Sequence, residues 1–190
     1  MIRRLCCVGA LAAALLATSV PVAHAATMSP NKWASKFCIA LKTWGDTTSQ
    51  KAGDVESSLS TVSDLETARD QLVQYLGEME AETQDAVDAL KKAGTPSTPN
   101  GGKIAALFVK ALQTTKAKFA DAKDDASHLS TTDPAAFATD SGRIATNLSR
   151  AGDAIGDSFD GAQKLDKGKK LENALKATRV CAFLGESTST

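Results

Sequence analysis

Apolar side chains recur every three to four positions over most of residues 29–183, which is the spacing of one face of an α-helix. The clearest stripe lies within residues 63–93, while acidic side chains such as Glu66, Asp70 and Glu78 fall outside it. The pattern predicts a long amphipathic helix that ends at Gly94 and Pro96, in the order usual for a helix C-terminus. The stripe consists of Leu65, Ala68, Leu72, Leu76, Met79, Thr83, Ala86, Val87 and Leu90.

Two further stripes predict helices of similar length. One covers residues 103–129, with Ile104, Phe108, Ala111, Thr115, Phe119, Ala122, Ala126 and Leu129. The other begins at Asp133-Pro134, a capping residue followed by a first-turn proline, and carries Phe137, Ser141, Ile144, Leu148, Ala151, Ile155, Phe159 and Ala162. Gly152 and Gly156 lie beside this second stripe, so we expect a neighbouring helix to approach closely there.

Shorter helical segments flank these three. Ser29-Pro30 begins a first helix, which we expect Gly53-Asp54 to interrupt. The basic stretch 164–170 contains Gly168 and predicts a break before a last helix over residues 169–183, and residues 186–190 are expected to form a frayed tail. The sequence therefore predicts an all-α fold, an antiparallel helical bundle of four to five helices, in one domain over residues 26–185.

The first 25 residues have the pattern of a secretory signal peptide. Arg3 and Arg4 precede an uncharged apolar run, and Ala23-His24-Ala25 supplies small residues at the cleavage positions. The apolar run is at the short end for a membrane span, so we favour cleavage after Ala25 over retention as an anchor. These features predict a protein that is secreted or held in the extracytoplasmic cell envelope.

Cleavage changes both the cysteine count and the charge. Cys6 and Cys7 leave with the signal, and Cys38 and Cys181 remain, so we expect them to form one disulfide in an oxidising compartment. Lys and Arg total 22, as do Asp and Glu, so loss of Arg3 and Arg4 leaves a net charge of −2. Such a balance does not favour a nucleic-acid partner. The mature chain contains no long apolar run, so we expect no transmembrane segment in it.

Several aromatic and turn residues resemble a family pattern. Trp33-x3-Phe37-Cys38-x2-Leu41-x2-Trp44 is followed by Leu90-x3-Gly94-x-Pro96-x4-Gly101 and by Cys181. This arrangement resembles a family of uncharacterised small secreted helical proteins of actinobacteria. The resemblance implies a helical fold and export, and it implies no activity.

Catalytic and metal chemistry find little support in the sequence. His128 is the single histidine after the signal, and both remaining cysteines are assigned to the disulfide, so we expect no nucleophilic catalytic site. Asp121, Asp125 and His128 share one helix face, but this face lies on the flank of the apolar stripe. We interpret it as a solvated helix end, and we predict no metal site and no cofactor.

The sequence leaves two functional readings. The first is a non-enzymatic binding or interaction module at or outside the cell envelope, with an unidentified protein or envelope partner. On this reading the aromatic cluster of Trp33, Phe37 and Trp44 is either core, which we favour, or a partner-binding ridge. The alternative is an anion or small-molecule site inside the bundle, including the site of a small metabolic enzyme. It would use Arg69 at the edge of the apolar stripe, with Arg143 and Arg150.

Overall fold

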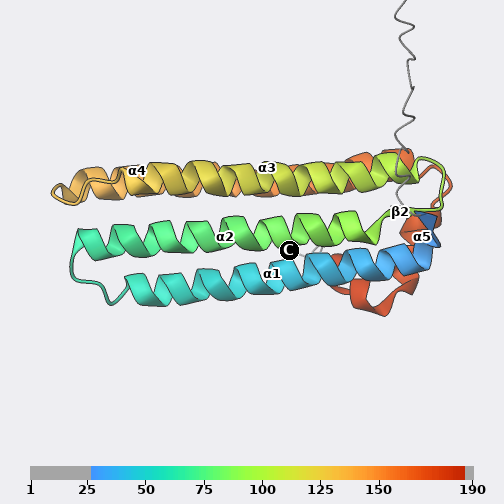
Figure 1. Cartoon of the computed structure of the whole chain (residues 1–190), viewed down its shortest axis with the longest axis horizontal. Helices are drawn as coiled ribbons and strands as arrows, with labels where there is room; N and C mark the ends of the chain where they lie inside the picture. Colours follow the sequence, from blue (N-terminus) through green and yellow to red (C-terminus); the bar gives the residue numbers. More distant parts are fainter. Residues whose placement is uncertain (1–26, 187–190) are drawn as a thin grey trace, which may run out of the picture.

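The computed structural model describes residues 27–186, apart from the side chains of residues 151, 185 and 186. The bundle has four long helices, each antiparallel to the next in the chain (Figure 1): α1 (Pro30–Leu59), α2 (Leu65–Ala93), α3 (Gly101–Ser127) and α4 (Pro134–Leu165). Each packs on the next in chain order. The chain closes with α5 (Lys170–Ala177), the 3₁₀ helix η1 (Arg179–Cys181) and α6 (Phe183–Glu186). The predicted all-α bundle is confirmed. The predicted signal at residues 1–25 and most of the predicted tail lie outside the described residues.

The helix ends follow the capping signals in the sequence. Asp64 caps α2, because its carboxylate accepts the backbone N–H of Thr67 at 2.7 Å. Asp133 caps α4 in the same way and accepts the N–H groups of Ala135 and Ala136 at 2.9 and 3.1 Å. Pro134 occupies the first turn, where no intrahelical donor is needed. Local chemistry therefore sets these two boundaries.

The expected interruption of the first helix at Gly53-Asp54 is wrong. α1 continues through both residues to Leu59. A glycine inside a helix costs roughly 1 kcal/mol relative to alanine, which does not by itself end a helix. Here Lys51 binds Glu78 of α2 at 2.8 Å, and Val55 is half-buried, so contacts with α2 hold the final turns of α1 in place.

Two expectations about the later helices also need correction. A Cβ built at Gly152 or Gly156 would meet nothing within 4 Å, so the expected close approach is not there. The tight contact is at Gly161, where a Cβ would lie 3.0 Å from Cδ1 of Leu107 on α3. The last predicted helix is broken into α5, η1 and α6, because Thr178 leaves helical geometry after α5 ends.

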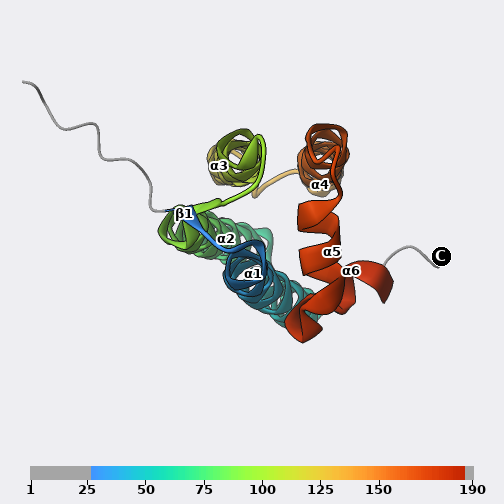
Figure 2. The ribbon, with the colours of Figure 1, turned by 90° about the vertical axis from the view of Figure 1, so that its right-hand side faces the viewer.

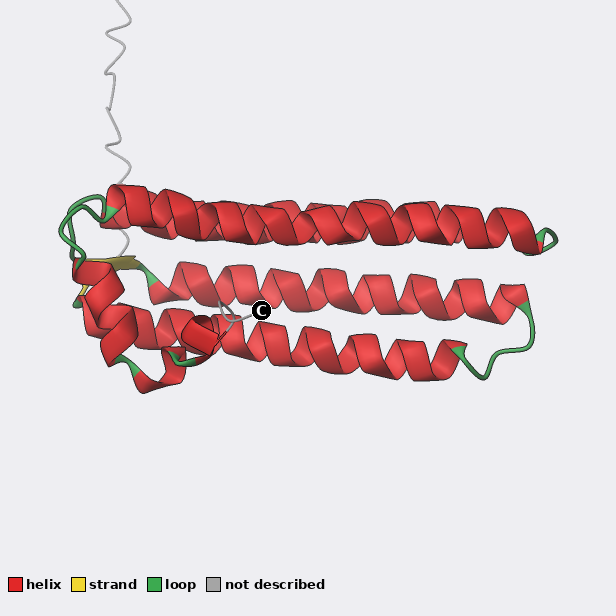
Figure 3. Cartoon of the chain, turned by 180° about the vertical axis from the view of Figure 1, so that it is seen from behind, coloured by secondary structure: helices red, strands yellow, loops and turns green. Residues whose placement is uncertain are grey.

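A two-stranded parallel pairing, which the sequence analysis did not predict, lies at one end of the bundle. β1 (Thr27–Met28) pairs with β2 (Thr95–Pro96), with Thr27 opposite Thr95 and Met28 opposite Pro96. Figure 3 shows these strands in yellow at the end of the bundle that also holds α5. The pairing fixes the start of the described chain to the turn between α2 and α3.

The buried side chains form two separate clusters. The first, which we call the disulfide-end core, joins α1, α2, α3, α4 and α5, and it includes Trp33, Phe37, Leu90, Phe108 and Leu171. The second, the distal core, joins α2, α3 and α4 near their other ends without any residue of α1. It consists of Leu76, Met79, Phe119, Ala122, Ala126, Leu129 and Ile144. Only one end of the bundle is therefore packed by helices from both termini of the chain.

The predicted disulfide joins these two ends of the sequence. Cys38 on α1 is bonded to Cys181 of η1, with the Cα atoms 5.2 Å apart. Figure 2 shows why they meet: α5 leaves the end of α4 and runs across towards α1. Within residues 27–186, no helix has the combination of length and apolar character that a bilayer crossing requires.

Candidate apolar binding pocket

The three arginines of the anion-binding hypothesis each bind nearby acids or face solvent. The side chain of Arg69 is 26% exposed and binds Asp70 at 2.7 Å, with Glu66 at 3.7 Å. Arg143 lies 3.5 Å from Asp125 of α3 and 3.6 Å from Asp140. Arg150 is exposed. None of the three lines either of the two pockets that we describe below.

His128 lies at the exposed C-terminal end of α3, where the sequence pattern placed it. Its Nδ1 is 2.8 Å from the carbonyl oxygen of Asp124 and 3.1 Å from the hydroxyl of Ser127. The neighbouring Asp125 binds Arg143, and Asp121 binds Lys118 at 3.5 Å. Across the described part of the chain, no group of three His, Cys, Asp or Glu side chains is placed to hold a metal ion.

A pocket of about 860 Å³ lies at the disulfide end, between α4 and the C-terminal segment. Its walls come from α4, α5, η1 and α6, and Phe108 of α3 also lines it. The apolar lining residues are Phe108, Phe159, Ala162, Leu171, Leu175, Cys181, Ala182 and Leu184. A concave site of this volume with a mainly apolar lining has the usual dimensions of a small-molecule site.

Aromatic rings form the floor of this pocket. Phe108 and Phe159 meet edge to face with ring centroids 4.9 Å apart. Phe37 packs against Phe108 at 4.6 Å, and Trp33 stacks on Phe37 at 4.7 Å. The indole N–H of Trp33 donates to the carbonyl oxygen of Gly94 at 2.9 Å, which ties the stack to the end of α2. Edge-to-face pairs are a preferred arrangement of aromatic rings, so these contacts stabilise the floor of the pocket.

Three polar residues of the pocket lining, Asp166, Glu172 and Lys176, interact within or with α5. Asp166 is buried and its carboxylate accepts the N–H groups of Leu171 and Glu172 at 2.8 and 2.9 Å, which anchors the first turn of α5. Glu172 binds Lys176 at 2.6 Å. The hydrogen bond from Lys176, reinforced by the charge of Lys169, lowers the pKa of Glu172 below its ordinary value. These groups therefore hold α5 in shape as the outer wall.

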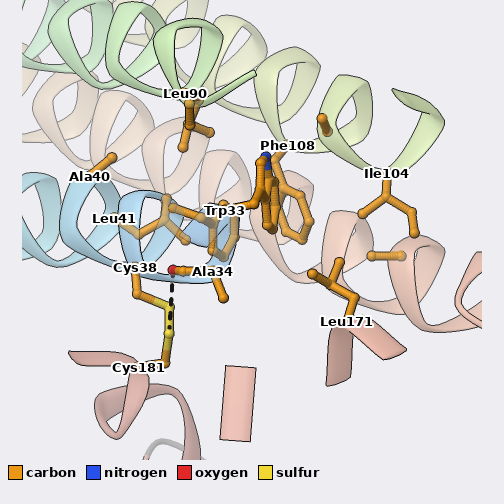
Figure 4. Packing of buried hydrophobic residues seen from close by; sticks show 14 of the residues in the cluster. Trp33, Ala34, Cys38, Ala40, Leu41, Leu90, Ile104, Phe108, Leu171 and Cys181 are labelled. Carbon is orange, nitrogen blue, oxygen red and sulfur yellow. Dashed lines mark hydrogen bonds between the residues drawn. A yellow bond between two sulfur atoms is a disulfide. The ribbon is translucent and has the colours of Figure 1, made fainter. Parts of the chain in front are cut away.

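The inner wall of the pocket is formed next to the disulfide. Cys181 lines the pocket and is only 4% exposed, and Cys38 behind it is fully buried. Figure 4 shows the bond between α1 and the C-terminal segment, with Leu171 and Phe108 in the same cluster. The sulfur of Cys181 lies 3.5 Å from the carbonyl oxygen of Ala34, a close contact rather than a hydrogen bond because a disulfide sulfur carries no hydrogen.

A second, smaller pocket lies between α1 and α2 and has a different character. Its volume is about 210 Å³, and its lining is largely polar, with Lys51, Gln71, Tyr75 and Glu78 among its residues. The hydrogen bond between Lys51 and Glu78 raises the pKa of Lys51 and lowers that of Glu78. These two charges therefore satisfy each other within the pocket.

The sequence predicts that some of the pocket residues are apolar and buried, but it does not predict the pocket. Phe108 and Phe159 lie on predicted apolar stripes, and a stripe predicts burial without saying which member borders a cavity. The core interpretation of the aromatic cluster is confirmed for Trp33 and Phe37, which are 2% and 0% exposed. Trp44 is half-buried and donates to Thr83 at 3.1 Å.

No known protein family, curated protein or solved structure matches this chain. The resemblance to small secreted proteins of actinobacteria stays a prediction. The described residues form a mainly apolar pocket of about 860 Å³ beside the disulfide.

Proposed function

We propose that this protein is a secreted, non-enzymatic binding module that takes one small apolar molecule into the pocket at the disulfide end. The observation that carries the proposal is the pocket of about 860 Å³ with its floor of Phe108 and Phe159. Ligand sites of soluble proteins are mostly apolar concavities of roughly 300–1,000 Å³. A volume of this kind fits a single small molecule better than a helix of a partner protein.

Three properties of the chain support the extracytoplasmic part of the proposal. The first 25 residues have signal-peptide character, and the Cys38–Cys181 disulfide is compatible with an oxidising compartment. The net charge of −2 after signal removal does not favour a nucleic-acid partner. We therefore place the ligand at the cell envelope or outside the cell. No contact of Arg69 favours the alternative of an anion site within the bundle.

A neutral fluorescent probe tests the proposal directly. N-phenyl-1-naphthylamine carries no charge, so its binding reports apolar contact alone. At roughly 0.3 kcal/mol per non-hydrogen atom, a probe of about 17 such atoms binds with a Kd of roughly 0.2 mM or tighter. We expect saturable one-to-one binding with enhanced emission, and competition by other small apolar molecules.

A pair of tryptophan variants locates the site. Ala182 lines the pocket and is itself exposed, so Ala182→Trp fills the pocket with little disturbance of the core. Ala106→Trp adds the same side chain at an exposed position of α3 that does not line the pocket. We expect the first variant to weaken probe binding at least tenfold and the second to leave it unchanged. Equal binding by both variants, or no saturable binding by the unmodified protein, would contradict the proposal.

A further inference from the structure

A large share of the pocket wall comes from a short C-terminal segment. Thr178, Arg179, Cys181, Ala182 and Leu184 all line the pocket, and all lie after the end of α5. The rest of the lining comes from α3, α4, the following residue Asp166, and α5. The position of residues 178–184 therefore decides whether the concavity is closed on its inner side.

This segment has little structure of its own. η1 spans three residues and α6 spans four, and helices this short are not stable without tertiary contacts. The backbone N–H groups of Cys181 and Ala182 donate locally, to the carbonyl oxygens of Thr178 and Arg179. Val180, Phe183 and Leu184 are only partly buried against the disulfide-end core. The covalent link between this segment and α1 is the Cys38–Cys181 bond.

The opposite walls have independent support. Phe159 and Ala162 lie on α4, which packs along α3, and the distal core holds α2, α3 and α4 together without any residue of the C-terminal segment. Loss of the disulfide would therefore loosen the walls formed by the C-terminal segment and by α5, while the walls on α3 and α4 stay in place.

We infer that the Cys38–Cys181 disulfide completes the ligand site, so that the protein gains its binding activity only after oxidation in the compartment to which it is exported. This inference rests on the proposed function. The reaction is thiol–disulfide exchange with a disulfide oxidant: the two thiols lose two electrons and two protons, and the oxidant's disulfide is reduced to two thiols. Before export, in a reducing cytosol, the chain would lack the inner wall and would not sequester an apolar molecule there.

Because the disulfide is buried, we expect it to form as the protein folds and not to act as a reversible redox sensor. Cys38 is 0% exposed and Cys181 is 4% exposed, so a reductant reaches the sulfurs only when the segment opens. Ligand in the pocket would contact that same segment and would oppose the opening. Binding and the disulfide are therefore expected to stabilise each other.

The first experiment removes the bond and measures affinity for N-phenyl-1-naphthylamine. We expect the double variant Cys38→Ala/Cys181→Ala to bind at least tenfold more weakly than the oxidised protein while its far-ultraviolet circular dichroism still reports the long helices. Leu76→Ala is the matched control, because it destabilises the distal core and leaves the disulfide and the pocket lining intact. That control should bind within twofold of the unmodified protein. A double variant that also binds within twofold would overturn the inference and leave the proposed function standing.

The second experiment needs no variant and remains decisive if the double variant does not fold. The fraction of oxidised protein is measured across dithiothreitol redox buffers, with and without saturating probe. Because linkage is reciprocal, the probe should shift the oxidation equilibrium by the same factor by which oxidation strengthens probe binding, at least tenfold. An unchanged equilibrium would overturn the inference. Absence of probe binding by the oxidised protein would instead overturn the proposed function and this inference with it.

Discussion

Reduction of the Cys38–Cys181 bond should lower the stability of the whole protein by a calculable amount. The bonded residues are 143 positions apart in the sequence. In the chain-entropy treatment, opening a loop of that length restores about 5 kcal/mol of conformational freedom to the unfolded chain at 25 °C. For a domain of roughly 160 residues, each kcal/mol moves Tm by about 2–4 °C, so we expect Tm to fall by roughly 10–20 °C.

We also expect reduction of the disulfide to destabilise one part of the protein before the rest. α5 is eight residues long and packs mainly on α1, and η1 depends on the same helix. The distal core contains no residue of α1 or of the C-terminal segment. Amide hydrogens of residues 170–186 should therefore lose protection first, while those in the distal halves of α2 and α3 keep theirs.

The assay is thermal unfolding followed by circular dichroism, combined with hydrogen exchange read by mass spectrometry. Because both sulfurs are buried, the protein is reduced in denaturant and refolded under reductant before the measurement. The double alanine variant, measured without reductant, should reproduce the melting curve of the reduced protein. A Tm change below about 3 °C, or a uniform loss of protection along the chain, would refute the reasoning.

Three further results are expected. Leu76 is fully buried in the distal core, so Leu76→Ala should lower the unfolding free energy in urea by about 2–5 kcal/mol. A Cβ at Gly101 would lie 2.0 Å from the carbonyl oxygen of Pro96, so Gly101→Ala should strongly destabilise the protein. Gly102→Ala, with nothing within 4 Å, should be neutral or stabilising by up to about 1 kcal/mol, and parallel urea titrations compare the two. The N–H of Thr67 lowers the pKa of Asp64 in the folded state, so the stabilisation by its charge is fully present above the unfolded pKa and is lost as pH falls through the folded pKa. Asp64→Asn should flatten the acid limb of the plot of urea midpoint against pH, and an unchanged limb would show that the carboxylate is not responsible.

Helix positions were predictable wherever a local signal and an apolar stripe agreed. The cap at Asp133 and the stop at Gly94 are local chemistry, and the structure uses both. The end of α1 was not predictable, because Gly53 suggests a break that Lys51 and its partners on α2 prevent. A tertiary contact outweighed a local preference of roughly 1 kcal/mol.

The pairing of Cys38 with Cys181 was predictable, because only these two cysteines follow the predicted signal and an exported protein meets an oxidising compartment. The split of the last helix was not, since Leu171, Leu175 and Val180 lie on a spacing that a continuous helix would also satisfy. The hypothesis of an anion site required the side chains of Arg69, Arg143 and Arg150 to meet at one site. The structure pairs Arg69 with the adjacent Asp70, and it places Arg143 near Asp140 of its own helix and Asp125 of α3.

The sequence alone determined the fold class, the boundaries of most helices and the disulfide, because helix periodicity, capping and cysteine oxidation act through near neighbours or through simple counting. Only the tertiary structure decided that α5 crosses from α4 to α1 and that residues 178–184 stand beside Phe108 and Phe159. A pocket is a space that packed elements leave between them, and its existence depends on angles and distances between segments far apart in the chain. An apolar stripe predicts that a side chain avoids water, but whether it meets another side chain or borders a cavity is fixed only when all the helices are in place.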